Sequence, residues 1–212
     1  MLNVKKIVIG ILRENCYIVY KSEKAIIIDP GYNFEIINDF LIKNNLTCQA
    51  ILLTHGHFDH IGAVRQFQKL GVKVYIHKED ADKCYDKDKS FATGHKNILP
   101  FNADVFFENK IENISLAGLN IKVIHTPGHS AGSCCFLIED HYLFSGDTIF
   151  FDGYGRTDFY DGNQDELLNS IKLLDTFITK NTKMFPGHDW FWFDINKMLD
   201  KIVFIWYIKK VN

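Results

Sequence analysis

Three histidines and one aspartate lie within six residues of one another in the segment THGHFDH, residues 54–60. The mostly apolar residues before it, QAILL, predict a short buried strand. Residues two apart in an extended segment point the same way, so His55, His57 and Asp59 are expected to face one point and His60 a neighbouring one. Imidazole and carboxylate groups are ligands that suit zinc or iron. The segment therefore predicts a metal site where a strand ends.

Three further metal-capable side chains follow other strand-like runs. His129 in HTPGHS and His188 in FPGH each come after a Pro-Gly pair, and Asp147 in FSGDTIF follows the run YLFSG. A loop at a strand's end presents such groups to a pocket while the strand fixes them. A lone histidine, by contrast, is more often an ordinary surface or core residue than a ligand. We interpret four histidines in that way: His77, His95, His125 and His141.

Strands and helices must position these groups. The strand-like runs are VKKIVIGIL, NCYIVY, KAIIID, QAILL, KVYIH, DVFF, LNIKVIH, CCFLIE, YLFSG and KMF. Helical spacing of apolar residues predicts helices over about 34–44 and 164–180, and one after the histidine segment with Val64, Phe67 and Leu70 inward. The polar stretch 78–100 predicts an excursion over the surface. Many strands with helices inserted after some of them suggest two sheets flanked by helices.

The bulk composition is typical of one soluble globular domain. The 212 residues are 47% hydrophobic and 24% charged, and the formal net charge is −2, which gives no reason to expect nucleic acid or an acidic membrane as partner. No apolar run approaches about 18 residues, so stable membrane insertion is not expected. Five irregularly spaced cysteines favour a reduced, cytoplasmic protein. The adjacent Cys134 and Cys135 are expected on opposite faces of a strand.

Together, THGHFDH, TPGHS, GDTIF and PGH resemble the metallo-β-lactamase superfamily, most closely its glyoxalase II-like (hydroxyacylglutathione hydrolase-like) single-domain members. The resemblance covers about Val4 to His188. It implies an α+β fold, the αββα sandwich of the metallo-β-lactamase type. It also implies two divalent metal ions, zinc first, with iron or manganese as alternatives. By this resemblance the first ion is held by His55, His57 and His129, the second by Asp59, His60 and His188, and both by Asp147.

The resemblance implies hydrolysis of a small-molecule thioester such as S-lactoylglutathione. Two ions about 3.5 Å apart share a bridging hydroxide, which is the nucleophile, while Asp59 both ligates and orients it. One metal polarises the carbonyl. A thiolate leaves with little protonation, which suits a site without an evident general acid. A β-lactam amide would need a proton donor, so a thioester is the preferred expectation.

The substrate residues follow from the same resemblance. Arg156, in GRTD, falls where glyoxalase II enzymes have a lysine that contacts glutathione, and Trp190 falls where they have a tyrosine on that ligand. Arginine can hold a carboxylate with two hydrogen bonds, or it can pair with Asp158 as scaffold. The helical C-terminal domain of glyoxalase II does not fit in the residues after His188. Glutathione specificity therefore does not follow from the resemblance.

Other interpretations remain at this stage. GRTDF and HDW also resemble persulfide dioxygenases of the same superfamily, which would use one iron held by His55, His129 and Asp147. A non-catalytic scaffold is disfavoured because all seven ligand positions are filled. The domain is expected to span 1–212, and its tail, 190–212, departs from the family pattern. An apolar stripe there predicts a packed terminal helix, with an oligomer contact or a membrane-surface hook as alternatives.

Overall fold

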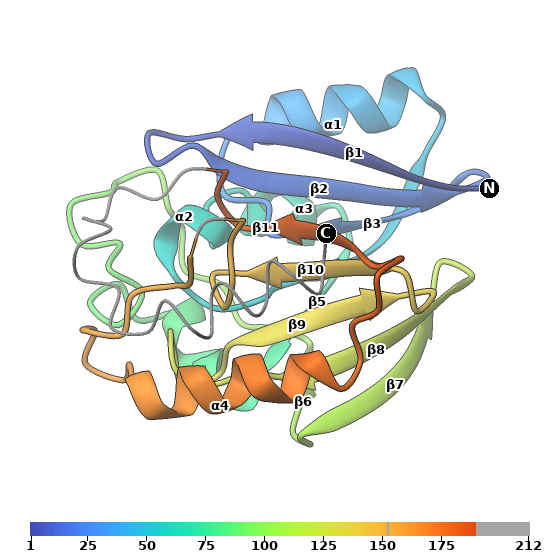
Figure 1. The fold of residues 1–212 in the computed structure, drawn as a ribbon. Helices are drawn as coiled ribbons and strands as arrows, with labels where there is room; N and C mark the ends of the chain where they lie inside the picture. Colours follow the sequence, from blue (N-terminus) through green and yellow to red (C-terminus); the bar gives the residue numbers. More distant parts are fainter. Residues whose placement is uncertain (152, 190–212) are drawn as a thin grey trace.

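The computed structural model describes residues 1–151 and 153–189, in which two β-sheets stack between helices (Figure 1). The first sheet has the strand order β1-β2-β3-β4-β5-β6. Its strands are Leu2–Ile9, Glu14–Lys21, Lys24–Ile28, Thr47–Leu52, Lys73–His77 and Val105–Phe107. The second sheet has the order β11-β10-β9-β8-β7. Its strands, in that order, are Lys183–Pro186, Tyr142–Gly146, Cys134–Ile138, Leu119–His125 and Ile111–Leu116.

Helices cover the outer faces of both sheets. On the first sheet lie α1 (Phe34–Lys43), α2 (Phe58–Ile61) and α3 (Val64–Lys69), and on the second lies α4 (Gln164–Asp175) (Figure 1). A 3-10 helix, η1 (Lys78–Cys84), follows β5. The predicted α+β class and its helix-sheet-sheet-helix layers are confirmed. None of the helices in the two described ranges has the length and apolar character needed to cross a membrane.

Three apolar cores hold the layers together. In β3, Ala25 and Ile27 face α1 to α3, whereas Ile26 and Ile28 face the second sheet. This alternation buries both faces of the strand, because successive side chains point to opposite sides. The adjacent cysteines lie on opposite faces of β9, as predicted. Cys134 packs between the sheets, and Cys135 packs with Leu167 and Ile171 of α4.

Strand direction brings several chain segments to one end of the sandwich. Strands β3 to β6 are parallel, and so are β10 and β11. Strands β10 and β11 both point toward the end where α2 lies (Figure 1). The carboxyl ends of parallel strands meet at one edge of a sheet, where side chains from distant segments can converge.

The structure corrects four local predictions. Residues 78–84 form η1, in which Asp80 and Lys83 are buried rather than lying over the surface. Strand β7 was not predicted, α4 ends at Asp175 instead of near residue 180, and Leu70 is 63% exposed instead of facing inward. The helix predicted for the tail lies outside the described residues.

Candidate metal centre

Four strand ends deliver the seven predicted ligands to one place. His55 and His57 follow β4, and Asp59 and His60 begin α2 beyond them. His129, Asp147 and His188 follow β8, β10 and β11. All seven residues are buried, the most exposed being Asp147 at 8% of its surface. Both sheets therefore contribute ligands to one buried centre.

Six of the seven side chains form two adjoining clusters, each with ligand atoms within 4.8 Å of one another. The first consists of His55, His57 and His129, and the second of Asp59, His60 and His188. In the first, His57 Nδ1 lies 3.0 Å from His129 Nε2. In the second, His188 Nε2 lies 3.3 Å from Asp59 Oδ2.

Asp147 lies between the two clusters. Its Oδ2 is 3.6 Å from both His129 Nε2 and His188 Nε2, and its Oδ1 is 3.5 Å from His60 Nε2. One carboxylate thus contacts members of both sets. A residue that bridges two cations would have this position.

Hydrogen bonds on the far side of the rings fix which nitrogen faces the centre. His60 Nδ1 donates to Asp29 at 3.0 Å, and His129 Nδ1 donates to the carbonyl of Arg156 at 2.8 Å. His188 Nδ1 donates to the carbonyl of Leu12 at 3.1 Å. A histidine that donates from one nitrogen keeps a lone pair on the other. In its neutral form, each of these three rings therefore presents the Nε2 lone pair to the centre, as a metal ligand must.

Asp29 is a supporting residue that the sequence did not identify. Its carboxylate accepts the Thr54 backbone N–H at 2.8 Å and the Thr54 hydroxyl at 2.6 Å, besides His60 Nδ1. The Thr54 hydroxyl in turn lies 3.0 Å from His55 Nδ1. One carboxylate at the end of β3 therefore orients a histidine of each cluster. The sequence holds one signal for this role. Asp29 directly follows the apolar run AIII, and a carboxylate at the end of a buried strand needs hydrogen-bond partners.

The donor set fits a cation. The Nε2 atoms of His55, His57 and His60 and the Oδ1 atom of Asp147 are buried, and none has a hydrogen-bond partner among the described residues. A buried polar atom without a partner costs free energy, so such atoms normally have one. The ligand atoms of His55, His60 and Asp147 lie within 4.8 Å of one another, and a divalent ion among them would satisfy their unpartnered atoms. His57 differs, because its Nδ1 and not its Nε2 faces His129.

Burial and neighbouring charges keep the first cluster neutral. Burial lowers the pKa of His55, and the neighbouring His60 and His57 lower it further. Burial, followed by His129, lowers the pKa of His57. For His129, burial lowers the pKa and outweighs the opposing effect of Asp147. Neutral imidazole is the form that ligates metals.

In the second cluster, neighbouring charges outweigh the effect of burial on the pKa values. Burial acts to raise the pKa of Asp59, but His60 and His188 outweigh it and hold the pKa below its usual value. Burial acts to lower the pKa of His60 and of His188, yet neighbouring carboxylates, Asp59 and Asp147, raise both. Asp59 is therefore a carboxylate, the form that binds a metal and accepts a hydrogen bond.

Strand β2 fastens the turn that carries His188. The carbonyl of Pro186 accepts the Asn15 side-chain amide at 3.0 Å and the Tyr17 hydroxyl at 2.7 Å. The backbone N–H of Asn15 donates to Gly187 at 2.7 Å. The first sheet therefore holds a ligand that the second sheet supplies.

Arg156 adjoins the first cluster through its backbone carbonyl, while its side chain pairs with Asp158. Arg156 Nε and one terminal nitrogen each lie 2.5 Å from a carboxylate oxygen of Asp158, and the guanidinium stacks over Phe159 at 4.6 Å. The pairing with Asp158 is the scaffold alternative considered above. Trp190 lies outside the described residues.

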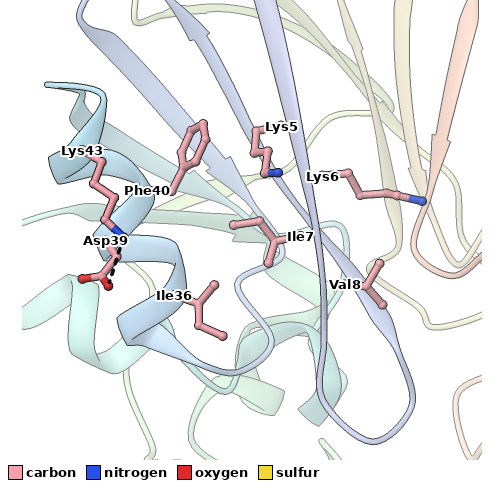
Figure 2. A pocket seen from close by; sticks show the side chains of 8 residues that line it. All are labelled: Lys5, Lys6, Ile7, Val8, Ile36, Asp39, Phe40 and Lys43. Atoms are coloured by element: carbon pink, nitrogen blue, oxygen red, sulfur yellow. Dashed lines mark ion pairs between the residues drawn. The ribbon is translucent and has the colours of Figure 1, made fainter.

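Two other features lie away from the metal centre. His77, Glu79 and His125 also bring ligand atoms within 4.8 Å, but the two imidazoles stack at 3.8 Å and 11°, so their in-plane lone pairs run parallel instead of converging. A hollow of about 570 Å³ lies between β1 and α1, with Lys5, Lys6 and Phe40 among its lining side chains (Figure 2). None of the seven residues of the candidate metal centre lines this hollow.

Comparison with known proteins identifies the family. The chain matches the metallo-beta-lactamase superfamily over residues 9–188, and it belongs to that superfamily. It is 33% identical over 193 residues to the hydroxyacylglutathione hydrolase GloC of Haemophilus influenzae, an alignment that covers 89% of this chain and 87% of that protein.

Two solved structures show the same fold. BLEG-1, a B3 metallo-beta-lactamase, has a TM-score of 0.82 and 33% identity, over 88% of this chain and 91% of that one. TTHA1623 in a di-iron-bound form has a TM-score of 0.74 and 33% identity, over 87% and 91% of the two chains. The predicted family and its αββα sandwich are confirmed. The superfamily is one of metal-dependent hydrolases that bind divalent ions, and this chain has His/Asp clusters of the kind they use.

Proposed function

We propose that this chain is a dinuclear metal hydrolase that cleaves a small thioester, such as S-lactoylglutathione or a similar acyl thiol. The observation that carries the proposal is the pair of buried His/Asp clusters that share Asp147 and contain unpartnered ligand atoms. A relative named hydroxyacylglutathione hydrolase supports the substrate class. The ligand assignment is the one given above, three residues to each ion and Asp147 to both.

The chain's own residues would prepare the reaction as follows. Divalent ions, when bound, supply an activated water nucleophile and polarise the substrate carbonyl. Asp59, kept ionised by His60 and His188, would ligate and accept a hydrogen bond from the attacking water, which orients it. The backbone and carboxylate acceptors behind His60, His129 and His188 hold the rings in place as charge develops.

The leaving group is the reason for preferring a thioester. The ring N–H groups of His60, His129 and His188 donate to acceptors on the far side of the rings, so they are not directed at a leaving atom. A thiolate departs with little protonation, whereas an amide nitrogen needs a proton. We propose zinc as the metal, with iron or manganese as alternatives, since a di-iron form of TTHA1623 exists.

The test measures metal content together with three activities: thioester hydrolysis, persulfide-dependent oxygen uptake and β-lactam hydrolysis. Wild type should contain about two metal ions per chain and hydrolyse S-lactoylglutathione. His57→Ala should lose hydrolysis with an unchanged circular dichroism spectrum, and His188→Ala should drop from about two ions to one. His141→Ala, an exposed histidine outside the centre, is the matched control.

Other outcomes decide against the proposal. One iron in both wild type and His188→Ala, with persulfide-dependent oxygen uptake, would establish the dioxygenase instead. Faster hydrolysis of a chromogenic β-lactam than of any thioester would keep the metal centre and replace the substrate. Wild-type activity in His57→Ala, with full metal content, would contradict the ligand assignment.

A further inference from the structure

Outside the metal centre, one buried carboxylate contacts both turns that carry the first ligand cluster. Asp80, in η1, is fully buried. Its Oδ2 accepts the Gly56 backbone N–H and the Ser130 hydroxyl, each at 2.8 Å. Its Oδ1 accepts the Gly132 backbone N–H at 2.7 Å. Gly56 separates His55 from His57, and Ser130 follows His129, so Asp80 joins the two turns.

A buried lysine extends this contact to a third segment. Lys83 is 1% exposed, and its Nζ lies 2.8 Å from Asp80 Oδ1 and 2.6 Å from Asp161 Oδ2. Asp161 also accepts the backbone N–H of Ala131 at 3.1 Å. Lysine is almost never fully buried unless it is paired, and here two carboxylates pair with it. We call Asp80, Lys83 and Asp161 the buried ion cluster.

The two turns have glycines where they contact η1, and these glycines leave no room for a side chain. A Cβ atom at Gly56 would lie 2.5 Å from Lys83 Cβ, and one at Gly132 would lie 2.5 Å from the backbone nitrogen of Asp80. Any larger residue would push the ligand-bearing turns away from η1. Both turns are therefore built to lie directly against the ion cluster.

We propose that the buried ion cluster positions His57 against His129 and thereby sets the metal affinity of the first ligand cluster. The inference rests on the proposed metal centre. His57 Nδ1 and His129 Nε2 lie 3.0 Å apart although 72 residues separate them, and Asp80 is the single side chain that bonds to both of their turns among the hydrogen bonds of the described residues. Buried ion pairs contribute little net stability but can impose one geometry, which is the role assigned here. All three are positioning residues.

The main test is zinc affinity of the metal-free full-length chain in the His188→Ala background, where only the first cluster is complete. Competition with a chromophoric chelator gives the dissociation constant. Lys83→Met should weaken zinc binding by about 10- to 100-fold, as losses of supporting partners usually do. Lys89→Met is the matched control, because Lys89 pairs with Asp82 of the same 3-10 helix at the surface and should leave the affinity unchanged.

A second variant and a second readout separate positioning from simple scaffolding. Asp161→Asn keeps the shape and should weaken zinc binding in the same direction by a smaller factor, even if Lys83→Met fails to fold. Co²⁺-substituted protein should show shifted d–d bands in both variants, because these bands report ligand geometry. A purely structural role would lower the urea midpoint of the metal-free protein while leaving affinity and spectrum unchanged, and that result overturns the inference. A His188→Ala protein that binds no zinc at all would overturn the proposed function as well.

Discussion

Arg156 takes part in the site through two different groups. Its backbone carbonyl accepts the His129 Nδ1–H, whereas its guanidinium pairs with Asp158 and stacks over Phe159. The side chain is 39% exposed and Asp158 is 65% exposed, so solvent screens the pair and its net contribution to stability is small. A substrate carboxylate would therefore compete with Asp158 for a guanidinium that is already aligned.

This competition predicts effects of opposite sign at the two residues. If Arg156 binds a substrate carboxylate, Arg156→Ala should raise KM for a carboxylate-bearing thioester about tenfold with a smaller change in kcat, and Arg156→Lys should partly restore it. Asp158→Asn should lower KM, because it removes the competing anion. Steady-state kinetics on the three variants decides the matter. Unchanged KM values in all three would leave Arg156 as scaffold.

At the residue scale, the sequence located groups that share a motif and missed groups that act across the chain. The seven histidines and aspartates stand out because each follows a strand-like run, and the structure brings them together. Whether they bind metal stays a prediction. Asp29 and Asp80 were missed because their partners lie 25 and 52 residues away, at Thr54 and Gly132, and no local spacing reports such pairs.

At the element scale, the strands with pronounced apolar runs were predicted, whereas β7 was not. Strands β3 and β4 are buried on both faces, which gives runs such as AIII and AILL. Strand β7 alternates exposed and half-buried positions, so its run IENISL has too few apolar residues to predict a strand. The charged segment KEDADKC suggested the surface, but Asp80 and Lys83 neutralise each other in the interior.

The stacked histidines connect strands of different sheets and make stability depend on pH. His77 ends β5 and His125 ends β8, with ring centroids 3.8 Å apart. Burial, and then His125, lowers the pKa of His77 from 6.5 to about 4. In the unfolded chain, His77 is therefore protonated below about pH 6.5. In the folded chain, it stays neutral down to about pH 4. Stability contributed by neutral His77 is complete above pH 6.5 and is lost as pH falls through this window.

We expect His77→Phe to flatten this part of the pH profile. The phenyl ring keeps a flat partner for His125 and does not titrate. Across the window the wild type should lose up to about 3 kcal/mol more free energy of unfolding than the variant, from about 1.4 kcal/mol per pKa unit. Urea denaturation at pH 7 and pH 4.5 measures the difference, with His141→Phe on the surface as control. Parallel profiles for wild type and His77→Phe would contradict the assignment.

At the scale of the whole molecule, the proposed centre joins the two halves of the sandwich. His55 and His57 follow a strand of the first sheet, whereas His129, Asp147 and His188 follow strands of the second. Bound metal would cross-link the two sheets at one end, and the unfolded chain has no such preformed site. Metal binding should therefore stabilise the fold as a unit.

Metal removal should accordingly lower the melting temperature of the whole domain. A free metal concentration of 100 times Kd stabilises a protein by about 2.7 kcal/mol, which for a chain of this size corresponds to a fall of about 5 to 11 °C when the metal is withdrawn. Differential scanning calorimetry before and after treatment with a chelator, and again after zinc is returned, measures the change. The double variant His57→Ala/His188→Ala, which lacks a ligand in each cluster, should melt at the same temperature with and without zinc. A wild-type melting temperature that neither the chelator nor zinc alters would show that the two clusters do not hold a metal that links the sheets.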